Sequence, residues 1–214
     1  MKYDIYLFDL DGTLTDPKIG ITKSFQYALA EFGIHEELDN LTKFIGPPLR
    51  ESFGGYGFSE SDIEKAVSKF REYFVKTGMF ENTVYHDIPD ILQNLKDRGR
   101  TLAVATSKVT EYANRILEHF NLAQYFDFVS GDEMDGSLTK HGKRDIIQIA
   151  LDNLDSERKM STVMIGDRKH DVLGANDVGI DSIGVMWSCY GSRDELETSG
   201  ATWIVDNANE ICDI

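Results

Sequence analysis

Two aspartates two positions apart are the residues of this chain best suited to chemistry. They lie in "FDLDGTLTD", where Asp9 and Asp11 follow an apolar run and precede Gly12. Asp-Gly is a hairpin signal, but the following "TLTDPKIGITKSF" is typical of a loop and then a helix, so a pairing strand is missing. A calcium loop starting at Asp9 would need Gly where Leu14 stands. The pair therefore favours a metal-assisted anion site, with an acidic turn as the alternative.

A second acidic cluster lies in "GDRKHD", where Asp167 and Asp171 are four positions apart at a predicted strand-to-helix turn. Like charges at that spacing destabilise a helix, which indicates a cation or a basic partner between them. Their other interpretation is helix capping, since acidic residues suit a helix N-terminus. Asp9, Asp11 and Asp167 offer hard oxygen ligands but too few to fill an octahedron, a set that matches Mg²⁺ with its retained waters. Zinc is not expected, because none of the five histidines pairs at ligand spacing.

Lys143 opens a predicted helix and is a candidate contact for an anion, although a solvated surface lysine is its ordinary interpretation. The surrounding "GSLTKHGKR" resembles a phosphate-binding P-loop only superficially. Five residues separate Gly136 from Gly142, and Arg144 replaces the Ser or Thr that such a loop uses for magnesium. We therefore reject the P-loop and keep Lys143 as a separate candidate.

Three apolar runs end in polar side chains: "IYLFDLD" at Asp9, "LAVATS" at Thr106 and Ser107, and "TVMIGD" at Asp167. In open α/β sheets, ligands bind outside the carboxyl ends of the strands, near the point where the strand order reverses. One such ending is ordinary, but three together, two of them acidic, indicate one shared crevice.

The elements that must position these residues alternate as expected for βαβ units, so the predicted fold is α/β, a Rossmann-like doubly wound and mostly parallel sheet. Gly99 and Gly179 follow two of the helices as stop signals. The predicted strands are Tyr3–Phe8, Thr101–Ala105, Phe126–Val129, Thr162–Ile165, Ser182–Val185 and Thr202–Val205, and the predicted helices are Ile88–Arg98, Thr110–Phe120, Lys143–Leu154, Lys169–Val178 and Arg193–Ser199.

The alternation breaks between Thr15 and about Phe80, where we predict no strand. Two apolar stripes at helical spacing occupy this stretch, and we interpret both as core packing. Between them, "FIGPPLRESFGGYGFS" is rich in Pro and Gly and predicts loops and short helices. The expected organisation is an α/β core of residues 1–14 and 81–214 with an all-helical cap of residues 15–80. The stripes are Ile21, Phe25, Leu29 and Phe32, then Ile63, Val67, Phe70 and Phe74.

The composition and net charge of the chain argue against some classes of binding partner. The net charge of −15 over 214 residues argues against nucleic acid polymers, because duplex binding needs clustered Lys and Arg. The apolar stretch near the N-terminus is too short for a signal peptide or a membrane span, and the two cysteines form no disulfide framework. We therefore expect a cytoplasmic protein without a membrane partner. No heptad or long apolar face stands out, so we expect a monomer or a weak homodimer.

These motifs together resemble those of haloacid dehalogenase superfamily phosphatases with a helical cap. "DLDGTLTD" resembles the first motif of that family, "ATS" the second, Lys143 the third and "IGDRKHD" the fourth. The resemblance covers the whole chain and is greatest to the phosphoglycolate phosphatase group, with "FIGPPL" similar to a bacterial 5′-nucleotidase-like branch. Two departures are that Arg144 follows Lys143 where the family often has Pro, with Lys140 close by, and that Ser107 stands where relatives often carry Asn.

The resemblance implies a magnesium-dependent phosphatase acting on a small phosphorylated metabolite. Asp9 would attack phosphorus, and Asp11 would act as acid and then as base. Magnesium would be held by Asp9, Asp167 and the Asp11 carbonyl, with Asp171 in an outer position. The cap would close over the site and provide specificity, with Arg50 as a candidate substrate contact. Phosphoryl oxygens would be held by Thr106, Ser107, Lys143 and the N–H groups of Leu10 and Gly12.

Three other functions remain open on the sequence alone. A sugar-phosphate mutase of the same superfamily would share the core. A phosphoacceptor signalling domain would also use an aspartate and magnesium on a doubly wound sheet, but has no use for the helical insert or Asp11. A non-catalytic metal-binding module would not need Asp11 and Lys143 together. Phosphoglycolate and a nucleoside 5′-monophosphate are both candidate substrates.

Overall fold

The computed structural model describes residues 2–140, 142–154 and 161–214, which form two compact units. One unit comprises the chain up to Asp16 together with Val84–Ile214, and the other comprises Pro17–Thr83. Within the described residues, no helix has the length and hydropathy needed to cross a bilayer.

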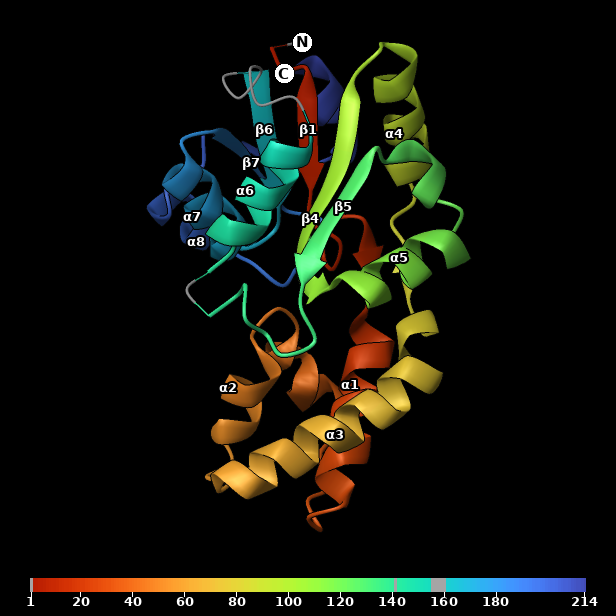
Figure 1. Ribbon diagram of the computed structural model, residues 1–214, viewed down its shortest axis with the longest axis vertical. Coiled ribbons are helices and arrows are strands. Elements are labelled where there is room, and N and C mark those ends of the chain that lie inside the picture. The colour runs from red at the N-terminus through yellow and green to blue at the C-terminus, as the bar shows by residue number, and fades with distance from the viewer. Residues whose placement is uncertain (1, 141, 155–160) are drawn as a thin grey trace. The chain divides into compact units, whose positions relative to one another are not determined.

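The first unit is built on a six-stranded sheet in the order β5-β4-β1-β6-β7-β8, in which every neighbouring pair is parallel (Figure 1). From β1 the chain adds β4 and β5 on one side and then crosses to β6, β7 and β8 on the other. The strand order therefore reverses at β1. Its strands are β1 (Ile5–Phe8), β4 (Thr101–Val109), β5 (Phe128–Asp132), β6 (Thr162–Gly166), β7 (Asp181–Val185) and β8 (Trp203–Val205).

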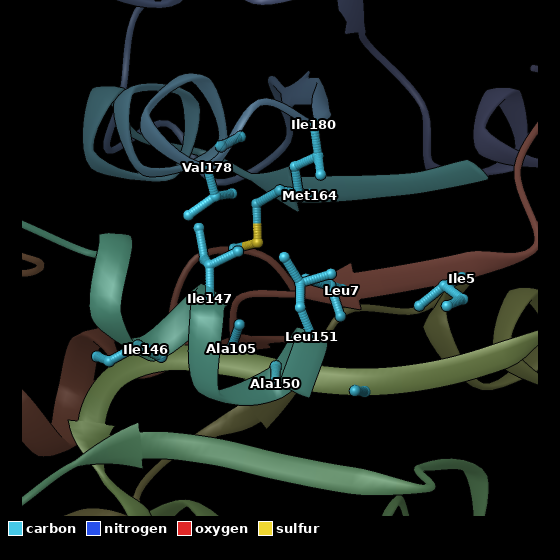
Figure 2. Packing of buried hydrophobic residues seen from close by; sticks show 12 residues of the cluster. Ile5, Leu7, Ala105, Ile146, Ile147, Ala150, Leu151, Met164, Val178 and Ile180 are labelled. Carbon is cyan, nitrogen blue, oxygen red and sulfur yellow. The ribbon is translucent and has the colours of Figure 1, made fainter. Parts of the chain in front are cut away.

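Helices α6 and α7 cover one face of this sheet, and α4 and α5 cover the other (Figure 1). Figure 2 shows Ile147 and Leu151 of α6 beside Leu7 of β1 and Met164 of β6, all buried in one apolar cluster. This packing fixes the strand ends relative to the helix starts. The helices of this unit are α4 (Ile88–Asp97), α5 (Thr110–His119), η3 (Ala123–Tyr125), α6 (Arg144–Asn153), α7 (Lys169–Val178), α8 (Arg193–Thr198) and η5 (Ala208–Asp213).

The predicted α/β fold with a parallel sheet is confirmed, and the helix limits agree within two residues. Gly179 has the left-handed φ of +75° that ends α7 as expected. Strand β4 is longer than predicted. It extends to Val109 because its pairing with β5 resumes at Asp132 after an irregularity that begins at Ala105.

The second unit is mainly helical and packs around aromatic rings. The Phe25 ring centroid lies 4.8 Å from that of Phe44, 4.9 Å from Phe53 and 5.0 Å from Phe70. Both predicted stripes supply this core, although Phe32 is only half-buried. The unit contains α1 (Lys18–Ala30), η1 (Leu38–Phe44), α2 (Leu49–Gly54), α3 (Glu60–Lys76) and η2 (Gly78–Phe80).

The prediction of no strand from Thr15 to about Phe80 was wrong at its first residues. Strand β2 (Thr15–Asp16) pairs with β3 (Thr83–Val84) in a separate two-stranded sheet. A two-residue strand carries no alternating apolar pattern, so periodicity alone does not reveal it.

Candidate active site

Three of the predicted site residues lie at the carboxyl ends of three adjacent strands. Asp9 follows β1, Asp167 follows β6, and Thr106 lies in the last part of β4. The Asp9 N–H donates to the Ile165 carbonyl oxygen at 2.9 Å, which ties the end of β1 to β6. Since β1 lies between β4 and β6, these side chains meet where the strand order reverses.

Three carboxylates form an acidic cluster at this edge of the sheet. Asp9, Asp167 and Asp171 each offer an oxygen, and these oxygens lie within 4.8 Å of one another. Asp167 and Asp171 are each 1% exposed, and Asp9 is 9% exposed. Buried carboxylates so close together repel one another unless a cation lies between them, so the cluster indicates a divalent metal site.

Asp167 has the arrangement that best fits a hard cation. Its Oδ2 accepts a hydrogen bond from the Ser188 hydroxyl at 2.7 Å, whereas its buried Oδ1 has no hydrogen-bond partner among the residues that the structure describes. Burial, together with the carboxylates of Asp171 and Asp9, raises the pKa of Asp167 to about 8. A divalent ion at Oδ1 would satisfy that oxygen and reverse the shift, so the donor set fits a hard cation.

Lys143 supplies the positive charge of the site. It occupies the position before α6, its side chain is 2% exposed, and its Nζ lies 2.8 Å from Asp9 Oδ1 and also donates to Asp171 Oδ1. Burial lowers the pKa of Lys143, but Asp171 and Asp9 outweigh it and raise that pKa above its usual value. Of the two lysines that the sequence offered, the structure places Lys143 among the carboxylates, whereas Lys140 is exposed.

Asp171 connects this cation to the backbone of α7. Its Oδ1 accepts from Lys143, and its Oδ2 accepts from the Arg168 N–H at 3.1 Å. Both expectations for Asp171, a basic partner and a helix cap, therefore describe it. Because a Cβ on Gly166 would overlap the Asp171 carboxyl, only glycine fits there. With both oxygens engaged, Asp171 is better placed to orient Lys143 than to bind a metal directly.

The Asp11 side chain pairs with a different lysine from Asp9. Its Oδ2 lies 2.7 Å from the Nζ of Lys108, and it is not part of the Asp9 cluster. Burial raises the pKa of Asp11, and the ammonium of Lys108 opposes that shift. The two aspartates of the motif thus face separate lysines, Asp9 with Lys143 and Asp11 with Lys108.

Gly12 closes the turn after Asp11. It has a φ of +84°, and a Cβ there would overlap the Asp167 carboxylate, so two independent constraints require glycine. Its N–H donates to the Thr15 carbonyl oxygen at 2.7 Å. That bond engages the N–H expected to face a phosphoryl group, so Leu10 remains the backbone donor candidate from this turn.

The remaining candidates, Thr106, Ser107 and Arg50, differ in their exposure and in the unit to which they belong. Thr106 is 2% exposed, whereas the next residue, Ser107, is exposed. Thr106 is therefore the better candidate of the two for a contact within a buried site. Arg50 belongs to the other unit, where it is exposed and forms ion pairs with Glu60 at 2.7 Å and with Glu64.

Most of the chain matches the model of one protein family. Residues 6–185 match the model of the haloacid dehalogenase-like hydrolases, a span that contains Asp9, Thr106, Lys143 and Asp167. The chain belongs to this family. The prediction made from "DLDGTLTD" and the later motifs is therefore confirmed, including that of an enzyme, a haloacid dehalogenase-like phosphatase.

Individual relatives are similar over nearly the full chain. A 5′-nucleotidase from Pseudomonas aeruginosa is 46% identical over 204 residues, which cover 94% of this chain and 90% of the relative. The tyrosine-protein kinase PtkA from Mycobacterium tuberculosis is 38% identical over 95% of this chain and 69% of its own. The crystal structure of a predicted phosphatase from Clostridium acetobutylicum has a TM-score of 0.91 and 46% identity, covering 100% of this chain and 98% of the other.

This haloacid dehalogenase-like hydrolase also has site residues that the sequence analysis missed. Lys108 pairs with Asp11, and the loop after β7 supplies Ser188 to Asp167. In the same loop, the Trp187 indole N–H donates to the Thr13 carbonyl oxygen at 3.1 Å, and the Tyr190 hydroxyl donates to Asp16. The polar run "WSCYGS" after an apolar strand was the one available signal for this loop.

Proposed function

We propose that this chain is a Mg²⁺-dependent phosphatase that hydrolyses a small phosphomonoester, of the nucleoside 5′-monophosphate type, through an aspartyl-phosphate at Asp9. The observation that carries the proposal is the convergence of Asp9, Lys143 and Asp167 at one edge of the sheet, where Oδ1 of Asp167 has no hydrogen-bond partner among the described residues. The 46% identity to a 5′-nucleotidase supports the substrate class.

Electrostatics explains why a phosphatase needs this cluster. A carboxylate approaching a phosphate dianion at about 4 Å is opposed by about 8 kcal/mol at an effective dielectric constant near 20. Magnesium, bound by Asp9, Asp167 and the Asp11 carbonyl, would neutralise charge on the phosphoryl group and offset a repulsion of that size. Lys143 adds a second positive charge at 2.8 Å from Asp9 Oδ1.

Asp9 would act as the nucleophile. Its oxygen would form a bond to phosphorus as the bond from phosphorus to the leaving oxygen breaks, which divides one difficult displacement into two easier ones. The Leu10 N–H, the Thr106 hydroxyl and Lys143 would hold the phosphoryl oxygens. Asp11 would give its proton to the leaving oxygen and then take a proton from the water that hydrolyses the aspartyl-phosphate.

Metal dependence tests this proposal on the wild-type protein. We expect turnover of p-nitrophenyl phosphate with Mg²⁺, a fall of at least ~100-fold after chelation, and recovery when Mg²⁺ is restored. Undiminished turnover in chelator would contradict the proposed requirement for Mg²⁺.

A panel of phosphomonoesters tests the substrate class. Nucleoside 5′-monophosphates should show higher kcat/KM than phosphoglycolate, and the reverse order would contradict the substrate class alone.

Ser188 is expected to tune the metal affinity through Asp167. Its hydroxyl holds Oδ2 and leaves Oδ1 for the ion, so Ser188→Ala should raise the Kd for Mg²⁺ about tenfold or more, in the range found for groups that orient metal ligands. Calorimetric titration of Mg²⁺ measures this directly. Ser130→Ala is the matched control, because Ser130 is also buried and donates at 2.7 Å, but to the Ile146 carbonyl oxygen. Equal Kd values in both variants would contradict the assignment.

A further inference from the structure

We propose that Lys108 is a positioning residue that holds the carboxyl group of Asp11 in the orientation needed to protonate the leaving oxygen. The inference rests on the proposed function and adds a residue to it. It starts from the ion pair of 2.7 Å between Lys108 Nζ and Asp11 Oδ2.

The pair is largely shielded from solvent and engages only one of the two carboxyl oxygens of Asp11. The side chain of Lys108 is 8% exposed and that of Asp11 is 18% exposed. While Oδ2 faces the ammonium, Oδ1 has no hydrogen-bond partner among the described parts of the chain. An ammonium fixed on one oxygen restricts rotation of the carboxyl group, so the other oxygen keeps a defined direction.

The backbone around Lys108 is itself held in place. From Ala105 to Val109, β4 advances four residues while β5 advances only two, from Ser130 to Asp132. Irregularities of this kind redirect side chains and are frequent beside active sites. The Lys108 N–H donates to the Thr106 hydroxyl at 3.3 Å.

A close approach of β5 fixes the same segment from the other side. A Cβ on Gly131 would lie 2.5 Å from the Lys108 carbonyl oxygen and 2.8 Å from the Thr110 nitrogen, so the two backbones meet where only glycine fits. Lys108 thus projects from a rigid part of the strand, which is what precise placement of a catalytic partner requires.

The two lysines of the site have different partners. Lys143 contacts Asp9 and Asp171, whereas Lys108 contacts Asp11. Loss of Lys108 should therefore affect two proton transfers of Asp11, first to the leaving oxygen, which accepts the electron pair of the breaking P–O bond, and then from the water that hydrolyses the aspartyl-phosphate. Only the first transfer depends on the leaving group.

A role of Lys108 in the first proton transfer predicts that the loss of activity in its variants depends on the leaving group. An alkoxide is a poor leaving group and needs the proton from Asp11, whereas p-nitrophenolate leaves readily without one. General acid catalysis contributes about 10² to 10⁴ in rate. Hydrolysis of the shared aspartyl-phosphate contributes to kcat on both substrates, whereas kcat/KM reports the steps up to loss of the leaving group. In Lys108→Met, we therefore expect kcat/KM on an alkyl phosphate such as glycerol 2-phosphate to fall at least ~10-fold more than kcat/KM on p-nitrophenyl phosphate.

The test compares both substrates in wild type, Lys108→Met and Lys108→Arg under saturating Mg²⁺. Arginine keeps the positive charge and should restore part of the alkyl phosphate activity. Lys96→Met is the matched control, because Lys96 forms an ion pair of 2.9 Å with Asp127 in the same unit, and it should change neither substrate. Lys108→Gln is the second neutral variant should the methionine variant fail to fold.

The outcomes are distinct. Selective loss on the alkyl phosphate supports the positioning role. Equal loss of kcat/KM on both substrates, or no loss on either, overturns it, because a structural ion pair would not distinguish leaving groups. Failure of the proposed function itself would look different, since wild type would then turn over neither substrate.

Discussion

Asp9→Asn should lower kcat on p-nitrophenyl phosphate by at least ~10³-fold, because the loss of a nucleophile from a group of residues that act together costs about 10⁴ to 10⁶ in rate. The amide has the shape of the carboxyl group but cannot attack phosphorus efficiently. Folding should be retained, since the change removes one of three mutually repelling carboxylates of the acidic cluster. Steady-state kinetics and thermal unfolding of the same preparation measure both effects.

The control for Asp9→Asn is the same chemical change at a surface ion pair. Asp206 is exposed and pairs with Arg193 at 2.7 Å, so Asp206→Asn should leave kcat unchanged. If Asp9→Asn kept more than ~10% of wild-type turnover, an aspartyl-phosphate at position 9 would be contradicted.

Lys143→Met should produce the largest loss of stability among the substitutions considered. Removal of the buried ammonium leaves the carboxylates of Asp9 and Asp171 without their cation, and breaking one partner of a buried ion pair costs about 3–5 kcal/mol. Methionine has a similar length and can fill the space, so the loss reports charge and not a cavity. The measurement is urea unfolding in chelator, analysed for the free energy of unfolding.

Lys96→Met provides the reference for Lys143→Met. Its ion pair with Asp127 is partly exposed, and such pairs contribute about 0–1 kcal/mol. A loss below ~1 kcal/mol in Lys143→Met would mean that the two carboxylates do not depend on the lysine, which contradicts its place in the site.

The α/β fold and most of the acidic residues of the cluster could be predicted from the sequence alone. Apolar strands of the parallel sheet are buried on both faces, so they stand out as continuous runs, and their ends mark the crevice. Asp9 and Asp167 were visible for that reason, and the spacing of Asp167 and Asp171 also indicated a basic partner. Lys143 is a basic partner of one of them, Asp171, and its second carboxylate partner is Asp9.

The residues that the sequence did not reveal act through contacts between distant segments. Trp187 and Thr13 are 174 positions apart, and Trp187 lies outside the four motifs. Ser188 and Lys108 have types and spacings that are ordinary for a surface loop and a strand end. The structure shows that Lys108, where the pairing of β4 with β5 is irregular, contacts Asp11. It also shows that Ser188, in the loop after β7, contacts Asp167.

The central claim is that Asp9 carries the phosphoryl group, and the most direct test uses Asp11→Asn with p-nitrophenyl phosphate. This substrate needs no acid to leave, but hydrolysis of the intermediate needs Asp11 as base, so the phosphorylated protein should accumulate. After acid quench, peptide mass spectrometry should find one phosphoryl group on Asp9. A phosphoryl group on another residue, or turnover without any covalent phosphoryl group, would contradict the mechanism.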